Sequence, residues 1–181
     1  MNKFQHTDFI FELEHFLSDD ECLAFIEQSE GEGYTSADVQ LKETRSVLSN
    51  IRNNERLNYF SEELALDFWK KLSEVNFPKV LNRNAIGISP YFRFYKYYEG
   101  QKFNMHKDGR QTIGKDKTLC TFLIYLNQGF LGGSTEFRTN SLIIQPKTGS
   151  ALCFEHHEWH KGSTVIEGVK YVLRTDVIYA S

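Results

Sequence analysis

From Pro90 onwards the apolar residues of this chain alternate with a period close to two, and this pattern constrains the fold more than any other feature. Successive side chains of an extended strand point to opposite faces, so such alternation predicts half-buried β-strands. Gly, Asn or Pro residues separate the runs, as expected for strands joined by turns. The predicted strands are 91–98, 119–126, 135–138, 141–145, 150–154 and 171–179.

Two helices are predicted ahead of these strands. Ser18 and Glu21 have the spacing of a capping box, and apolar residues follow them, so a helix is expected over about 19–29. Ser61 opens a second stretch with helical periodicity, which Pro78 closes. Both apolar stripes are expected to cover a core.

Helices followed by a run of strands predict an α+β, mainly β protein. The expected architecture is a β-sandwich or jelly roll with the N-terminal helices packed on one face. The 14% aromatic content agrees with a β-rich core. A chain of 181 residues without repeats or a Pro-rich linker predicts one domain, 1–181. Within it, 1–89 is the expected helical support region and 90–181 carries the core and the site.

Charge and cysteine content narrow the classes of partner and compartment. The formal net charge of −3 gives no general electrostatic reason to expect nucleic-acid binding. No apolar run reaches the length of a membrane span, and no signal-peptide segment is visible, so no membrane partner is expected. Three widely spaced cysteines predict neither a disulfide framework nor a zinc ribbon, which favours reduced thiols and a cytoplasmic location.

His106 and Asp108 are the first candidate metal ligands. On an extended segment, residues two apart point to the same face, so both side chains can reach one ion. A third ligand, His160, would complete one face of an octahedron and leave three positions open for a cosubstrate and O2. We interpret the set as a two-histidine, one-carboxylate iron site. His156 and His157 compete with His160, and the same donors also suit zinc.

Several further residues accompany the ligand candidates. Lys170 follows ten residues after His160, across a Gly turn, and its cationic head suits the distal carboxylate of a small dicarboxylate bound to the metal. Tyr95 and Tyr97 share one face of the strand that leads to His106 and can offer hydroxyls to the same anion. Arg174 lies about 13 Å beyond Lys170 at about 3.3 Å per residue. It is therefore a second candidate anchor or a substrate contact.

These motifs give the chain a resemblance to a known family. Tyr97 and Gly100 precede His106 and Asp108, and Gly132 and Gly133 follow the predicted strand 121–126. His160 is followed by Gly168 and Lys170. In this combination the chain resembles the 2-oxoglutarate- and Fe(II)-dependent oxygenases of the prolyl 4-hydroxylase-like branch, over roughly 52–179.

The resemblance implies a double-stranded β-helix core of the jelly-roll, cupin-like kind. By position, His106, Asp108 and His160 match the family's iron ligands, and Lys170 matches the residue that binds the C5 carboxylate of 2-oxoglutarate. Tyr97 matches a tyrosine that supports the cosubstrate, and Thr121 matches a strand residue near the same carboxylate. Relatives also carry an Arg-Asn-Asn sequence like the one that begins at Arg52, which suggests a substrate contact there.

The implied activity is hydroxylation of an unactivated C–H bond with O2, accompanied by release of succinate and CO2. Fe(II) and 2-oxoglutarate are the expected cofactors, with L-ascorbate as a reductant. The substrate can be a prolyl residue in a protein or peptide, a free amino acid or another metabolite. The alternatives are a cupin-like protein that binds a metal or small anion without turnover, a zinc hydrolase, and an interaction module with a decayed site.

Overall fold

The alternation of the strands divides the structure into two apolar cores on opposite faces of one large sheet. The structure is a computed structural model that describes residues 1–36 and 53–181. The large sheet has the order β1-β2-β13-β9-β16-β6-β4-β3, with β5 paired to β16 and β8 to β9. Its strands are Asn2–Thr7 (β1), Ile10–Glu14 (β2), Thr35–Ser36 (β3), Glu55–Phe60 (β4), Ala85–Ile88 (β5), Tyr91–Tyr97 (β6), Thr112–Ile113 (β8), Asp116–Tyr125 (β9), Ala151–Glu155 (β13) and Lys170–Tyr179 (β16).

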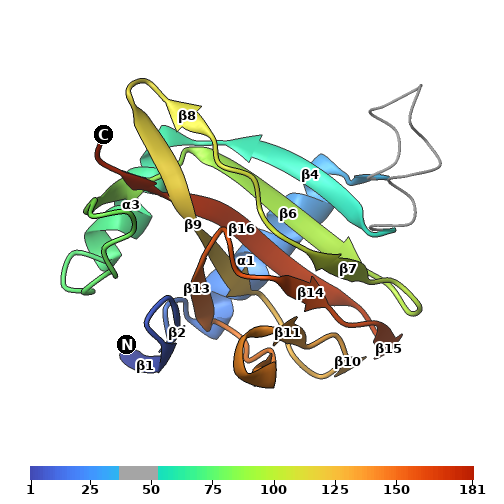
Figure 1. Cartoon of the computed structure of the whole chain (residues 1–181). Helices are drawn as coiled ribbons and strands as arrows, with labels where there is room; N and C mark the ends of the chain where they lie inside the picture. The colour runs from blue at the N-terminus through green and yellow to red at the C-terminus, as the bar shows by residue number, and fades with distance from the viewer. Residues whose placement is uncertain (37–52) are drawn as a thin grey trace, which may run out of the picture.

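A smaller sheet faces the large one. It has the order β12-β11-β14-β7, and a two-stranded ribbon of β10 and β15 lies beside it. Figure 1 shows the small sheet in front of β16 and β9, with α1 behind them. The two facing layers confirm the predicted jelly-roll core. The strands are Phe103–His106 (β7), Leu131–Gly132 (β10), Thr135–Phe137 (β11), Ile143–Ile144 (β12), His160–Gly162 (β14) and Val165–Glu167 (β15), and a short 3-10 helix spans Thr139–Ser141.

Both predicted helices are present and cover the far face of the large sheet. Helix α1 spans Asp19–Glu32, and Ser18 and Glu21 form the predicted capping box. Helix α3 spans Glu62–Lys71 and is capped by Ser61. Among the described helices, none is both long and apolar enough to cross a membrane.

The helix-facing core is rich in phenylalanine. Phe16 of the loop before α1 packs edge-on against Phe68 of α3 and Phe122 of β9, with ring centroids 5.0 and 5.1 Å apart. Edge-to-face pairs of this kind add to the stabilisation from buried area. The second core fills the space between the two sheets and includes Tyr125 and Phe154. One face of the large sheet therefore anchors the helices, and the other faces the candidate site.

The N-terminal half also contributes strands that the sequence pattern did not predict. Strand β4 pairs with β6 over six residues and extends the large sheet next to the site. Its sequence, Glu-Arg-Leu-Asn-Tyr-Phe, has only weak alternation. Strands β1 and β2 form a hairpin that continues the other edge of the sheet. Tertiary pairing rather than local pattern determines these elements.

Candidate metal and cosubstrate site

The structure brings the three predicted metal ligands together at the open end of the jelly roll. His106 ends β7, His160 begins β14, and the two residues are paired across these antiparallel strands. Asp108 lies two residues beyond His106. Its Oδ1 is 3.5 Å from Nε2 of His106, and its Oδ2 is 3.6 Å from Nε2 of His160. One donor atom of each residue therefore lies within 4.8 Å of the others, close enough for all three to bind one ion.

The hydrogen bonds of both imidazoles leave Nε2 available. Nδ1 of His106 lies 2.7 Å from the carbonyl oxygen of Asn104, and Nδ1 of His160 lies 2.9 Å from that of Glu158. A carbonyl oxygen only accepts, so Nδ1 carries a proton, and in a neutral ring this leaves on Nε2 the lone pair that binds a metal. Nε2 of His106 is buried and has no hydrogen-bond partner among the described residues. This buried, unpaired nitrogen fits a metal ligand.

Asp108 is buried beside a cation. Burial alone would raise the pKa of its carboxyl group, but Arg174, His106, His160 and Thr121 hold it well below its usual range. Burial also lowers the pKa of His160 to about 4. At neutral pH the carboxylate is therefore charged and the imidazole neutral, as metal binding requires.

Lys170 lies at the inner end of a cavity that the three ligand residues also line. Its side chain is buried, and its Nζ donates to the carbonyl oxygen of Gly133 at 2.6 Å. No carboxylate among the described residues forms an ion pair with it, and burial lowers its pKa to about 7. Nζ also lies 5.5 Å from the ring centroid of Tyr97 and 5.4 Å from that of Tyr125. A carboxylate bound here would supply the counter-charge that Lys170 lacks.

Gly133 makes room for this lysine. Its φ of +65° is in the left-handed region that glycine favours, and an added Cβ would come within 3.2 Å of Cδ of Lys170 and 2.8 Å of the Phe130 ring. The Gly-Gly turn predicted from the sequence thus has a second consequence, because it brings a backbone carbonyl next to the ammonium group.

The structure places Tyr97 and Thr121 at different ends of the inner cavity. Tyr97 pairs with Lys170 across β6 and β16, so the two side chains share a face of the sheet. Thr121, on β9, donates from Oγ1 to Oδ2 of Asp108 at 2.5 Å. Its position next to the ligand carboxylate suggests that it orients Asp108.

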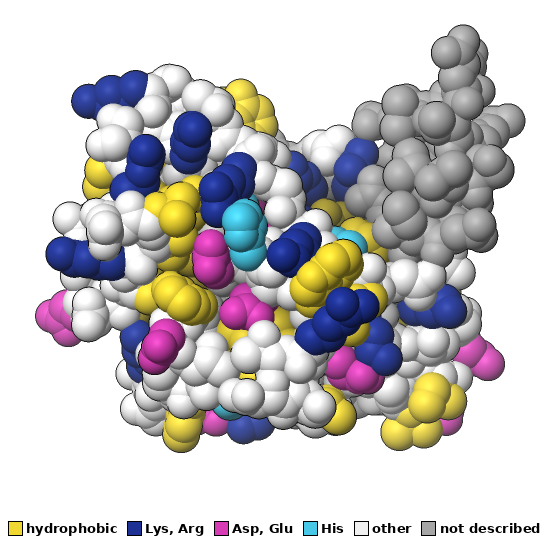
Figure 2. Space-filling view, in the orientation of Figure 1, with side chains coloured by type: hydrophobic (Ala, Val, Ile, Leu, Met, Phe, Trp, Pro, Cys, Tyr) yellow, Lys and Arg dark blue, Asp and Glu magenta, His cyan; other side chains and the backbone are white. Residues whose placement is uncertain are grey.

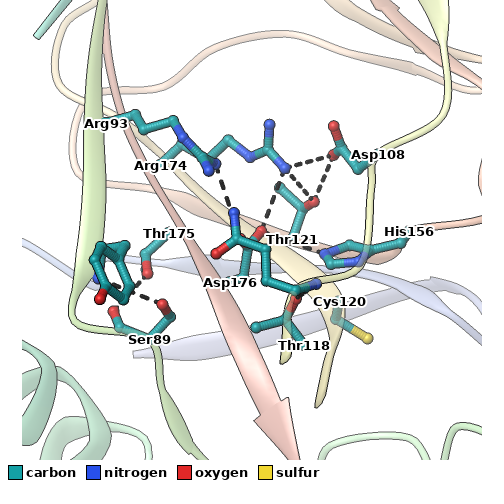
Figure 3. A network of polar contacts seen from close by, with 12 residues as sticks. Ser89, Arg93, Asp108, Thr118, Cys120, Thr121, His156, Arg174, Thr175 and Asp176 are labelled. Atoms are coloured by element: carbon teal, nitrogen blue, oxygen red, sulfur yellow. Dashed lines mark hydrogen bonds and ion pairs between the residues drawn. The ribbon is translucent and has the colours of Figure 1, made fainter. Parts of the chain in front are cut away.

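Arg174 has contacts that sequence reasoning missed. Its Nη2 lies 3.1 Å from Oδ2 of Asp108, 3.2 Å from Oδ1 of Asp176 and 3.3 Å from Oγ1 of Thr121. Figure 3 shows its guanidinium group between the two carboxylates. Burial would lower the pKa of Arg174, but Asp108 and Asp176 raise it, so the residue stays charged. Lys170 and Arg174 both line the inner cavity, and only the fold shows that Arg174 reaches Asp108.

The other candidate histidines lie elsewhere. His156 is buried with Nε2 3.3 Å from Oδ1 of Asp176, and His157 is exposed. Neither belongs to the group that could hold a metal. Arg52, the predicted substrate contact, lies outside the described residues.

Two imidazoles and one carboxylate whose donor atoms gather at one point in a jelly roll are typical of non-haem Fe(II) oxygenases. Residues 92–175 match the family model of the 2OG-Fe(II) oxygenase superfamily, and this range contains all three ligand candidates and Lys170. None of the curated protein sequences matches this chain.

Solved structures share the fold. The viral collagen prolyl hydroxylase of Paramecium bursaria Chlorella virus-1, solved with 2-oxoglutarate, has a TM-score of 0.65 and 22% identity, covering 95% of this chain and 97% of its own. A Pseudomonas putida prolyl 4-hydroxylase has a TM-score of 0.68 and 16% identity, covering 95% of this chain and 93% of its own. A Trichoplax adhaerens prolyl hydroxylase, solved with a hypoxia inducible factor peptide, has a TM-score of 0.69 and 19% identity. The match covers 94% of this chain and 84% of that one.

Residues 92–175 thus match the 2OG-Fe(II) oxygenase superfamily, the ligand candidates lie within this range, and the chain has a prolyl 4-hydroxylase-like fold. These findings support a 2-oxoglutarate-dependent dioxygenase with Fe(II) and 2-oxoglutarate as its cofactors.

Proposed function

We propose that this enzyme hydroxylates an unactivated C–H bond of its substrate, using O2 and 2-oxoglutarate and releasing succinate and CO2. One observation carries the proposal. The donor atoms of His106, Asp108 and His160 lie within 4.8 Å of one another. The whole described chain, from the support region 1–89 to the core 90–181, would act as one oxygenase domain.

His106, Asp108 and His160 would hold the iron. The two imidazoles would bind through Nε2, because backbone carbonyls already occupy both Nδ1 protons. Phe103 stacks on His106 with ring centroids 3.7 Å apart and restricts the rotation of the ligand ring. Fe(II) and 2-oxoglutarate, when bound, would supply the electrons that activate O2, which is the oxidant for hydroxylation.

Lys170 would bind the C5 carboxylate of 2-oxoglutarate. The buried ammonium has no ion-pair partner among the described residues, and an anionic carboxylate would favour its charged form. Tyr97 lies beside it and would support the cosubstrate. Thr121 would orient Asp108 and border the same cavity. The two ends of 2-oxoglutarate would thus be fixed by different elements, the metal ligands at one end and β16 at the other.

The substrate proposal is a protein, peptide or small molecule, with prolyl hydroxylation as the specific case. The fold likeness to three prolyl hydroxylases supports it, one of them solved with a peptide. L-ascorbate would serve as a reductant for oxidised iron. Buried, free Cys22, Cys120 and Cys153 support action in a reducing compartment such as the cytoplasm.

The test is succinate release from 2-oxoglutarate in three conditions: Fe(II) with air, Fe(II) without O2, and Zn(II) with air. We expect succinate only in the first, and more of it when a library of candidate substrates is added. Product formed equally with zinc, or without O2, would contradict an oxygenase. Metal binding without succinate in any condition would instead favour a cupin-like binding protein.

A further inference from the structure

A second pocket adjoins the inner cavity and is lined by four arginines. It shares Asp108, Tyr95 and Arg174 with the inner cavity but does not include Lys170. Its volume of about 310 Å³ is at the lower end of the range for small-molecule sites. We call it the arginine pocket. Its four arginines are Arg56 of β4, Arg93 of β6, Arg110 after β7 and Arg174 of β16.

The strand register concentrates this positive charge. Arg174 and Arg93 are directly paired across β16 and β6, and Arg56 pairs with Tyr95 one row further along the same face. Like charges directly opposite each other on neighbouring strands are destabilising. Asp176 lies near both arginines, 3.2 Å from Arg174 and 3.9 Å from Arg93, and a bound anion would add further compensation.

The carboxylates near the pocket compensate only part of the charge. Arg93 lies 3.9 Å from Oδ2 of Asp176, and Arg110 lies 3.7 Å from Oε1 of Glu155, both at the long end of ion-pair distances. Asp108 is the one acidic residue that lines the pocket itself, and it faces the metal position. Nε of the buried Arg174 has no hydrogen-bond partner among the described residues. Figure 2 shows both basic and acidic side chains around an exposed histidine on the face turned to the viewer.

We infer that the arginine pocket binds an oxyanion of the primary substrate, a carboxylate or a phosphate group. This inference rests on the proposed function, because it assigns the pocket to the substrate of that reaction. Guanidinium groups bind both anions through paired hydrogen bonds. An anion held there would place the adjoining carbon atoms of the substrate at Asp108, where the two cavities meet. The cosubstrate and the substrate would then be recognised by separate cations, Lys170 and the arginines.

The residues that test this inference are Arg93 and Arg110. Arg174 contacts Asp108, so its loss would also disturb the ligand carboxylate. Arg93 and Arg110 line the pocket without an ion pair to Asp108 among the described residues. Arg138 is the matched control, because it is exposed and packs on Trp159 outside the pocket.

The experiment is calorimetric titration of the protein loaded with Mn(II) and saturating 2-oxoglutarate. The probes are inorganic phosphate, N-acetylglycine and the uncharged N-acetylglycinamide. We expect saturable binding of one of the two anions, weakened about tenfold or more by Arg93→Gln and Arg110→Gln but not by Arg138→Gln. The anion that binds more tightly identifies the oxyanion of the substrate as a phosphate or a carboxylate. Arg110 is exposed, so Arg110→Gln tests the pocket even if Arg93→Gln does not fold.

Equal binding of N-acetylglycine and its amide without binding of phosphate would overturn the inference, as would anion binding that is absent or unaffected by both pocket variants. Anion binding measured without metal, compared with Fe(II)-dependent succinate formation, separates the arginine-pocket inference from the proposed function. Arginine-dependent anion binding in a protein that gives no Fe(II)-dependent succinate would refute the proposed function and leave the anion pocket standing. Succinate formation with no anion binding would refute the arginine-pocket inference and leave the proposed function standing.

Discussion

The two faces of the large sheet come from the same strands, and each has an apolar core, but the site-facing side of β16 also buries charged side chains. On β16, Leu173 and Val177 face the helices, while Lys170, Arg174 and Asp176 face the site, all of them buried. Buried apolar side chains stabilise a fold, whereas buried charges cost desolvation energy that pairing only partly restores. The comparison teaches that one face carries stability and the other carries function at some cost to stability.

Loss of a metal ligand should have the largest effect. His160→Ala should reduce Fe(II)-dependent succinate formation by more than about 100-fold, because losing even an outer-shell partner costs about 10–100-fold. His157→Ala is the matched control, since His157 is exposed three residues away. Equal loss in both variants would remove His160 from the site.

Truncation on the helix-facing side should instead act on stability. Phe122 is fully buried and packs on Phe16, so Phe122→Ala should lower the free energy of unfolding by about 3–5 kcal/mol. Urea unfolding measures this. Leu66→Ala, at a 60% exposed position of α3, should change it by about 0.5 kcal/mol or less. Similar values for the two variants would refute the apolar face as the source of stability.

Lys170→Met should separate the two properties. The Kd for 2-oxoglutarate should rise about 10–100-fold, because a charge-assisted hydrogen bond is lost. The cosubstrate-free protein should become more stable by about 1 kcal/mol, because a buried, unpaired ammonium group is removed. Lys147→Ala, which removes an exposed lysine paired to Glu14, controls for the loss of charge. Unchanged cosubstrate affinity would exclude Lys170 as the anchor.

The pH dependence of cosubstrate binding is the smallest expected effect. Burial lowers the pKa of Lys170 to about 7, and a bound carboxylate favours its protonated form. Binding above this pKa must therefore take up a proton, so the Kd for 2-oxoglutarate should rise with pH above about 7, by up to about tenfold per unit. Lys170→Arg, which stays charged, should flatten the profile. A rise of equal slope in this variant would assign the effect to another group.

Sequence alone predicted the local elements and the ligand set. The capping box at Ser18 needs only residues three apart, and the spacing of His106 and Asp108 needs only an extended backbone. Strands β2 and β4 were missed because pairing with the distant strands β13 and β6 determines them, and β1 because it depends on β2.

The electrostatic surroundings of the site could not be predicted in the same way. Arg174 reaches Asp108 because β16 lies between β9 and β6, and no local pattern contains that order. Arg93 faces Arg174 through the same register. His156 looked like a competing ligand until the fold placed it against Asp176. Residues that act through contacts between distant strands therefore need the structure.

The central claim is that one site binds Fe(II) and 2-oxoglutarate together, and anaerobic titration tests it most directly. Adding 2-oxoglutarate to the Fe(II)-loaded protein without O2 should produce the weak visible charge-transfer band of the chelate. Lys170→Ala should need more 2-oxoglutarate to reach the same absorbance, while Lys147→Ala should match the wild type. Absence of the band in the wild-type protein at saturating Fe(II) and 2-oxoglutarate would contradict the account.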